Sequence, residues 1–192
     1  MIGIPVGLLA ANAFEWVVHR YVLHGLGRRK QSFWAFHWHE HHGASRRGGM
    51  HDEHYERAPL GWHAQGKELL GLTGVAVAVS ALWPVAPFFV MTAYYSAFNY
   101  YRVHKRSHQD PEWARQHLPW HYDHHMGPDQ HKNWCVTRPW FDQLMGTREP
   151  YVGTEREAAD RARAEARRAR RSAAPSAAAA QATAEPTATA GA

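Results

Sequence analysis

The sequence predicts an all-α protein, an integral-membrane helical bundle with a histidine-rich helical cap on the cytoplasmic side and a disordered C-terminal tail. Apolar segments at residues 2–18 and 69–101 predict the membrane part, and sixteen histidines, most of them grouped beside these segments, predict the cap. The composition changes near residue 154, where Ala and Arg begin to dominate. We therefore expect two parts, a membrane domain at residues 1–153 and a tail at residues 154–192.

The first apolar segment, residues 2–18, contains a single charged residue, Glu15, and no basic residue precedes it. It therefore differs from a secretory signal peptide, which begins with a positively charged region. A helix needs about 20 apolar residues to cross a bilayer. This segment therefore predicts a short first membrane helix.

The second apolar segment, residues 69–101, contains no charged residue. Pro84 and Pro87 interrupt it, and proline breaks a helix because it lacks the amide hydrogen and clashes with the preceding turn. The segment therefore predicts a helical hairpin that enters and leaves the membrane on one side. Basic residues follow both segments, at Arg28, Arg29, Lys30, Arg46, Arg47, Arg102, Lys105 and Arg106. Since such residues concentrate on the cytoplasmic side, we expect this side to carry the cap; the alternative is a soluble protein with buried core helices.

The tail carries much of the net positive charge. Residues 155–171 contain seven Arg and four acidic residues, which accounts for three of the five net positive charges. The rest of the chain is close to neutral, whereas a nucleic-acid-binding protein has a basic stripe on its folded domain. We therefore expect no nucleic-acid partner. Residues 172–192 are mostly Ala, Pro, Thr and Ser, which cannot build a core, so we expect disorder after a solvated, charged run.

Four groups of histidines lie on either side of the second apolar segment. They are His19 and His24; His37, His39, His41 and His42; His104 and His108; and His121, His124 and His125. A helix brings positions three and four residues apart onto one face, so each of the last two groups can present its imidazoles to one centre. Cys135 is the only cysteine, which excludes a disulfide framework and a multi-cysteine zinc site.

The first two groups leave more than one arrangement open. His19 and His24 are five residues apart, about 140° around an α-helix, so we expect them to serve two neighbouring metal ions. In the second group either His37 or His39 can be the ligand. Imidazole suits iron, zinc, copper and nickel, and about ten imidazoles are too many for one ion. The sequence therefore predicts a site for two metal ions.

At these residues the chain resembles the fatty acid hydroxylase superfamily, which includes sterol desaturases and carotene hydroxylases. The pattern of that family is HxxxxH, HxHH or HxxHH, HxxxH and HxxHH. It is matched here at His19–His24, His39–His42, His104–His108 and His121–His125. The run NWCVTRPWFDQLMGT, which begins at Asn133, resembles the end of the family's sequences, so the resemblance covers about residues 12–150.

The resemblance implies a membrane enzyme with its active site on the cytoplasmic side. It implies two non-haem iron ions, which zinc can replace in purified or recombinant protein, and O₂ and a separate electron donor such as a ferredoxin or a cytochrome. The enzyme would hydroxylate or desaturate a C–H bond of a lipid, which could be a fatty acyl chain, a sterol-like ring or a carotenoid. The metal ions would supply the chemistry, while the protein supplies ligands and places the substrate. The family usually has two hairpins, so here the first one is reduced or the true start lies upstream.

Four further residues are candidates to orient the ligands through hydrogen bonds: Glu15, His117, Asp123 and His131. Glu15 lies one helical turn before His19, where a carboxylate can accept the ring N–H of a ligand imidazole. The alternative for Glu15 is a carboxylate at a helix boundary, and the alternative for His117 and His131 is a solvated surface position.

Two other classes of protein are alternatives to the oxygenase. A His-rich membrane protein that binds or transports metal would carry charged or His residues inside its spans, and residues 69–101 contain none. A zinc hydrolase would need an open site with about three ligands and a general base. In helical zinc proteases a Glu follows the first His of an HxxxH motif, whereas Lys105 follows His104 here.

Overall fold

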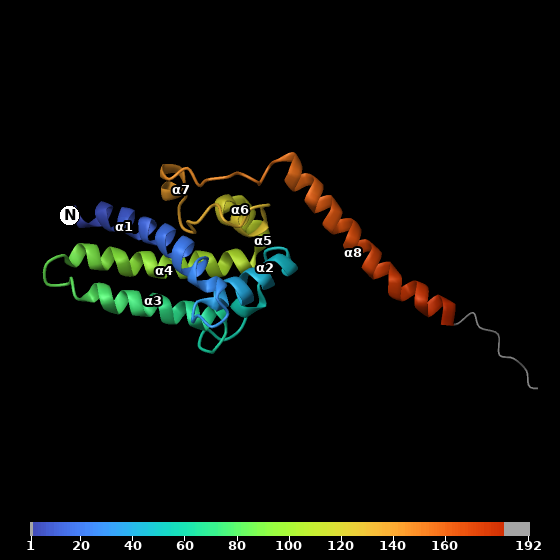
Figure 1. Cartoon of the computed structure of the whole chain (residues 1–192), viewed down its shortest axis with the longest axis horizontal. Helices are drawn as coiled ribbons and strands as arrows, with labels where there is room; N and C mark the ends of the chain where they lie inside the picture. Colours follow the sequence, from blue (N-terminus) through green and yellow to red (C-terminus); the bar gives the residue numbers. More distant parts are fainter. Residues whose placement is uncertain (1, 183–192) are drawn as a thin grey trace, which may run out of the picture. The chain divides into compact units, whose positions relative to one another are not determined.

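The structure is a computed structural model that describes residues 2–182, and over this range the chain forms helices and loops without a β-strand. The predicted all-α fold is therefore confirmed for the described part of the chain. The chain divides into two compact units, Met1–Val152 and Gly153–Ala192. The long helices of the first unit are α1 (Gly3–Val17), α3 (Ala64–Ser80) and α4 (Pro87–Gln109) (Figure 1).

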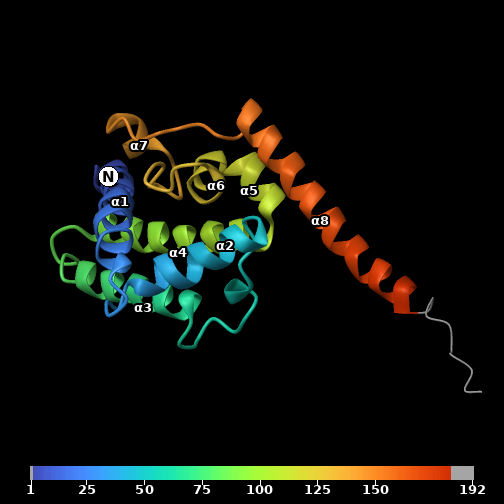
Figure 2. The same ribbon diagram turned by 45° about the vertical axis from the view of Figure 1, so that its right-hand side comes forward.

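Shorter helical segments complete the first unit. They are η1 (Val18–Leu23), η2 (Leu26–Arg28), η3 (Phe36–His42), α2 (Gly43–Gly48), η4 (Glu53–Tyr55), α5 (Pro111–His117), α6 (Pro119–Met126) and α7 (Trp140–Leu144). Helices α3 and α4 form a hairpin whose turn holds the two prolines, and Pro87 opens α4 at a position where no helical amide hydrogen is needed. Figure 2 shows α5, α6 and α7 on the side of α4 opposite α3.

Helix α1 packs closely against α4. The approach depends on Gly7, because a Cβ atom there would lie 2.8 Å from the Cβ atom of Thr92 on α4. Such a distance is shorter than carbon atoms tolerate, so a larger residue would push the two helices apart. The tight contact brings the C-terminal end of α1 beside the part of α4 that carries His104 and His108.

None of the helices within residues 2–182 combines the length and the apolar character that a membrane crossing requires.

The second unit contains α8 (Glu155–Ala182), which includes the charged run of the expected tail. Ala, Arg and Glu are strong helix formers, and they make up most of residues 155–171. Ion pairs between side chains four residues apart add support, as between Arg156 and Asp160 at 3.8 Å. The expected disorder of residues 183–192 lies outside the described residues.

Buried polar side chains hold the segment that follows α6. The carboxylate of Asp142, which is fully buried, accepts the backbone N–H groups of Trp134 and Cys135, each at 2.8 Å. It also accepts the hydroxyl hydrogen of Thr147 at 2.7 Å. This loop therefore takes its shape from one carboxylate.

A second set of polar contacts ties the same segment to α1. Asn12 donates its side-chain amide to the carbonyl oxygen of Arg138 at 2.8 Å and accepts the N–H of Phe141 at 3.1 Å. Three residues later, the carboxylate of Glu15 accepts the backbone N–H groups of Val136 and Thr137, each at 3.0 Å. Polar side chains on α1 thus anchor the loop at residues 136–141 through hydrogen bonds.

We expect Asp142→Ala to lower the free energy of unfolding by about 2–5 kcal/mol, because it leaves buried N–H groups without an acceptor. Denaturant titration followed by circular dichroism measures the change. The matched control is Asp129→Ala, whose carboxylate accepts the exposed N–H of His131, and its effect should stay within about 0.5 kcal/mol. Equal unfolding midpoints for the two variants would contradict this assignment.

Candidate metal centre

Nine buried histidines gather where the ends of η1, η3, α4 and α6 meet, and they form two groups. The first group is His19, His24, His37, His42 and His124, and the second group is His41, His104, His108 and His125. In each group one ring nitrogen per residue lies within 4.8 Å of the corresponding nitrogens of the others. Segments more than 100 residues apart in the sequence thus build one centre.

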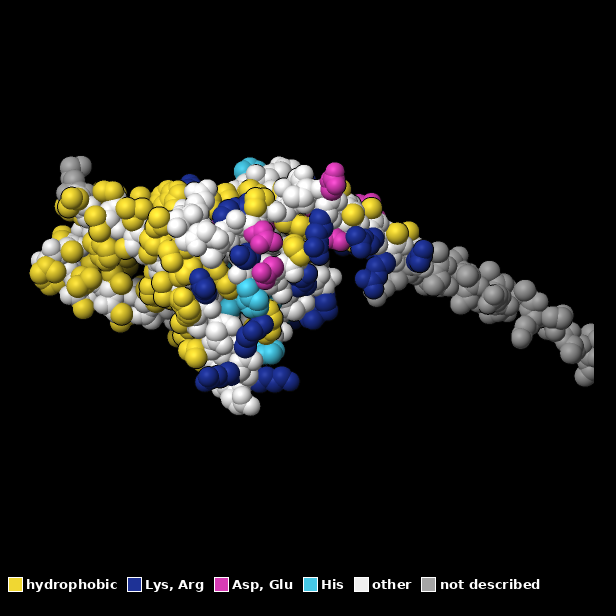
Figure 3. Space-filling view, turned by 45° about the horizontal axis from the view of Figure 1, so that its top comes forward, with side chains coloured by type: hydrophobic (Ala, Val, Ile, Leu, Met, Phe, Trp, Pro, Cys, Tyr) yellow, Lys and Arg dark blue, Asp and Glu magenta, His cyan; other side chains and the backbone are white. Residues whose placement is uncertain are grey.

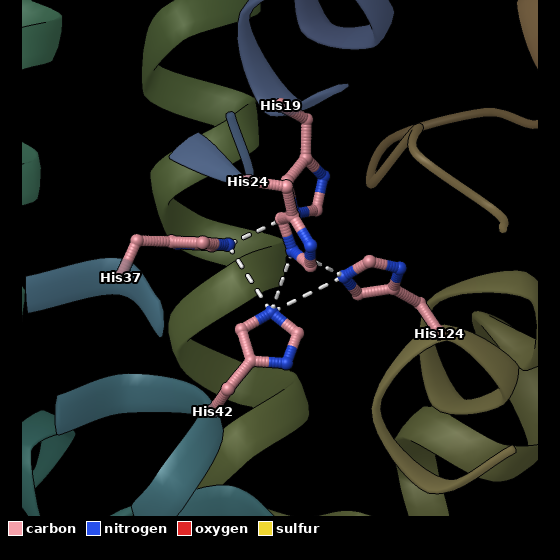
Figure 4. Close-up of side chains that lie close together, drawn as sticks. All are labelled: His19, His24, His37, His42 and His124. Atoms are coloured by element: carbon pink, nitrogen blue, oxygen red, sulfur yellow. Dashed lines mark hydrogen bonds between the residues drawn. The ribbon is translucent and has the colours of Figure 1, made fainter. Parts of the chain in front are cut away.

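In the first group the Nε2 atoms point toward one another, as Figure 4 shows. The Nε2 atom of His19 lies 2.9 Å from that of His37, and the Nε2 atom of His24 lies 3.0 Å from that of His42. The Nε2 atom of His124 lies 3.2 Å from those of both His24 and His42. The rings therefore surround a common point.

The five-residue spacing in η1 works because this segment is a π-helix. The backbone N–H of His24 donates to the carbonyl oxygen of His19 at 2.9 Å, five residues back instead of the usual four. The wider turn places positions five apart on nearly the same face, and the two rings lie 5.0 Å apart. His19 and His24, which we expected to serve two neighbouring metal ions, thus lie in the same group.

The segment η3 is also a π-helix, and it repeats the arrangement. His37 and His42 are five residues apart and both belong to the first group, whereas His41 turns toward the second group. His39 is exposed, and its Nε2 lies 3.2 Å from the carbonyl oxygen of Arg28. The structure thus brings His37 into the centre and leaves His39 outside.

His121 adjoins the second group. Its ring is fully buried, and its Nε2 lies 3.2 Å from the Nε2 of His108. The ring of His121 also lies 5.0 Å from that of His104 and 4.7 Å from that of His125. Ten of the eleven histidines predicted as ligands therefore lie in or against the two groups.

Hydrogen bonds around the first group fix which nitrogen carries the proton. The Nδ1–H of His19 donates to the carbonyl oxygen of Trp134 at 2.5 Å, and the Nδ1–H of His124 donates to that of Lys132 at 2.6 Å. A neutral imidazole has one N–H, so the inner Nε2 of each of these rings carries a lone pair. Lone pairs that face one another repel, and a cation between them removes the repulsion.

The second group has the same arrangement with charged outer partners. The Nδ1–H of His41 donates to Asp52 and that of His104 donates to Glu68, both at 2.8 Å. The Nδ1–H of His108 donates to the carbonyl oxygen of Met50, also at 2.8 Å. Among the described residues, no hydrogen-bond partner reaches the inner Nε2 atoms of His41 and His104. In five of the nine rings, those of His19, His41, His104, His108 and His124, the outer nitrogen is thus engaged, and such neutral imidazoles fit metal ions.

Electrostatics keep these imidazoles in the state that binds metal. Burial, with the neighbouring imidazoles, lowers the pKa of His37 and His42 well below the ordinary value, and burial lowers the pKa of His124 to about 3. Burial alone would raise the pKa of Asp52, but contacts with His41 and His54 lower it to about 2. Near neutral pH these three imidazoles are thus uncharged, while the carboxylate of Asp52 is ionised.

Within residues 2–182, none of the four residues predicted to orient ligands hydrogen-bonds directly to a ring of the two groups. The carboxylate of Glu15 accepts the backbone N–H groups of Val136 and Thr137, in the loop where the carbonyl oxygen of Trp134 accepts the Nδ1–H of His19. Glu15 therefore acts on that ring only through the loop. Asp123 is buried, accepts the N–H of Val152 at 2.7 Å and pairs with Arg148 at 2.7 Å.

His117 is exposed on α5, where its Nδ1–H donates to the carbonyl oxygen of Trp113 at 3.0 Å. His131 is exposed as well, and its ring lies 5.6 Å from that of His24. Sequence reasoning missed Asp52 and Glu68, the carboxylates that bind the second group. The available signal for Glu68 was an acidic residue directly before the second apolar segment.

An apolar cavity of about 420 Å³ lies between α1, α3 and α4 and reaches the histidines. Small residues from all three helices, among them Gly7, Gly71 and Ala97, make room for it. His19, His37 and His104 belong to its wall, together with Glu68 and Tyr100. The centre therefore opens onto an apolar space.

No known protein family, curated protein or solved structure matches this chain.

We expect His37→Ala to lose at least one of about two bound metal ions per chain, because it removes a ligand from the first group. The matched control is His39→Ala, two residues away, which should keep its full metal content. Mass spectrometry of purified, iron-supplemented protein measures the metal, and circular dichroism checks the fold. Metal loss in the His39 variant with retention in the His37 variant would contradict the assignment.

Proposed function

We propose that this protein is a membrane-bound oxygenase with two metal ions held by histidines, and that it hydroxylates or desaturates a C–H bond of a lipid. One observation carries the proposal: a centre of nine buried imidazoles forms part of the wall of an apolar cavity. A site of this composition suits a redox metal, and the cavity suits an apolar substrate. The resemblance of the four histidine motifs to fatty acid hydroxylases favours iron.

In this proposal each group of histidines holds one iron ion, and bound iron would activate O₂ toward an unactivated C–H bond. Asp52 and Glu68 hold the rings of His41 and His104 in place and raise the basicity of these ligands. The burial of all nine rings keeps bulk water away from the reacting atoms. The chain thus contributes orientation, charge and a dry site.

The cavity determines which part of a substrate would react. Much of its wall is apolar, with Phe14, Val75 and Phe89 among the lining residues. An alkyl or polyene chain in this space would place a carbon atom beside His19, His37 and His104. A fatty acyl chain, a sterol-like ring and a carotenoid each have the apolar character that this wall requires.

A large exposed apolar surface supports membrane binding. Figure 3 shows hydrophobic side chains gathered at the end of the first unit where α1 begins and where α3 and α4 meet. Ile2 and Val85 are each 81% exposed there. Soluble monomers rarely expose a continuous patch of this kind, whereas a lipid-contacting surface requires one. We propose that this end enters the membrane and that the metal centre lies on the cytoplasmic side.

The proposed reaction is tested with iron-loaded protein, a chemical reductant, O₂ and a lipid extract. We expect a product that has gained one oxygen atom or lost two hydrogen atoms, detected by mass spectrometry. Val75→Trp should lower product formation by about tenfold or more, because it fills the cavity and displaces the reacting carbon.

The matched control is Val77→Trp, on the same helix but with Val77 68% exposed, which should leave the rate unchanged. Iron-loaded protein that forms no product from fatty acyl, sterol or carotenoid lipids would contradict the oxygenase proposal.

Membrane insertion is tested separately with a fluorophore on a single introduced cysteine. We expect the emission of a polarity-sensitive label on Val85→Cys to shift to the blue when lipid vesicles are added. A label on Glu53→Cys, on the polar side, should not shift. Cys135 is fully buried and should not react with the label. Identical responses at the two positions would contradict insertion through the α3–α4 turn.

A further inference from the structure

Trp38 connects the first histidine group with the protein surface. Its indole is half-buried and lies edge-on to the ring of His24, with 5.0 Å between centroids. It also stacks on the ring of His42, with 5.4 Å between centroids and 30° between planes. On its outer side it stacks on the exposed ring of His131 at 5.6 Å and 13°. A path of aromatic rings in contact thus runs from solvent to two members of the group.

A cation lies at the outer end of this path, and further basic residues are close to it in the sequence. The guanidinium carbon of Arg28 lies 5.1 Å from the centroid of the Trp38 ring, and its Nη2 donates to Nε2 of His131 at 2.9 Å. Lys132 follows His131 in the chain, and its carbonyl oxygen accepts the Nδ1–H of His124. We call Arg28, Trp38, His131 and Lys132 the entry patch; Arg29 and Lys30, both exposed, continue its charge. One acid, Asp129, contacts the patch by accepting the backbone N–H of His131 at 2.8 Å.

We infer that the entry patch is the docking surface for an acidic protein that donates one electron at a time, and that Trp38 carries the electrons to the first histidine group. This inference rests on the proposed function. Hydroxylation of one C–H bond by O₂ consumes two electrons and two protons and yields an alcohol and one water molecule. Two molecules of a one-electron donor supply the electrons, and each is oxidised by one electron.

Ring contacts and charge favour this place as the route for electrons. Electron transfer slows steeply with distance, so a donor is most effective where the centre comes nearest to the surface. His19, His37 and His104 line the apolar cavity, which the substrate would occupy. Tyr55, which stacks on His108 in the second group, is only 1% exposed. The entry patch is wet and positively charged, which attracts and orients an acidic partner.

The test uses the full-length, iron-loaded protein and a reduced, acidic [2Fe–2S] ferredoxin under anaerobic conditions. Stopped-flow absorbance measures the oxidation of the ferredoxin, a signal that needs neither substrate nor product. We expect Arg28→Glu combined with Lys132→Glu to lower the second-order rate constant by about tenfold or more at low salt. The difference from the wild type should shrink as salt screens the charges. Arg57→Glu, at an exposed ion pair with Glu53 elsewhere on the chain, is the matched control and should behave as the wild type.

Trp38 is tested by two substitutions that keep the charge of the patch. We expect Trp38→Leu to slow electron transfer within the complex by about tenfold or more while the ferredoxin affinity stays the same, and Trp38→Phe to restore part of the rate. Metal content is measured for each variant. If the leucine variant loses iron, the comparison of the phenylalanine variant with the wild type decides the role of Trp38, and the charge-reversal variant decides the role of the docking surface.

Reduction by dithionite, a small reductant, separates the two levels of the proposal. Wild-type iron that dithionite reduces but ferredoxin does not would overturn the docking surface and leave the oxygenase proposal standing. The same holds if charge reversal abolishes binding to anionic vesicles while the ferredoxin rate is unchanged, since the patch would then bind lipid headgroups. Protein that binds no iron, or whose iron dithionite cannot reduce, would overturn both.

Discussion

The convergence of imidazole lone pairs in a buried space is the constraint on which the rest of the structure depends. In His19, His41, His104, His108 and His124 the outer nitrogen is bound to a carbonyl or carboxylate oxygen. The inner nitrogens therefore carry lone pairs with a single partner that suits them all, a cation. Since unpaired buried polar atoms are costly, so many of them in one place indicate clusters that could hold metal ions.

The two π-helical turns are the local device that makes the centre possible. In an α-helix, residues five apart point in different directions, which is why the sequence predicted separate metal ions for His19 and His24. In the wider π-helical turn, residues five apart point in nearly the same direction. This holds for His19 and His24 in η1 and for His37 and His42 in η3. The pitch of a helix over one turn depends on tertiary contacts, so spacing alone could not reveal it. The same spacing in both segments is the signal that, with a π-helix assumed, selects His37 over His39.

Features set by local sequence were predictable, and contacts between distant segments were not. The apolar segments became α1 and the α3–α4 hairpin, with the break at the prolines, because apolar length and proline act within one stretch of chain. Asp52 and Glu68 were missed because no periodicity records that a loop carboxylate meets a ring from another helix. Glu15 shows the opposite error. Its closeness to His19 in the sequence suggested direct contact, yet its carboxylate binds the loop whose carbonyl group holds that ring.

Some histidines of the centre border an apolar cavity, and others contact the solvent-exposed side of the protein. His19, His37 and His104 border the apolar cavity, while His24 and His42 contact Trp38 of the entry patch. An apolar substrate and a charged protein donor have opposite solvation needs, and a single opening could not meet both. Separate approaches would let the donor bind from water while the substrate remains in the apolar space. Within the first group, His19 lines the cavity while His24 contacts Trp38, so one metal-binding group borders both approaches.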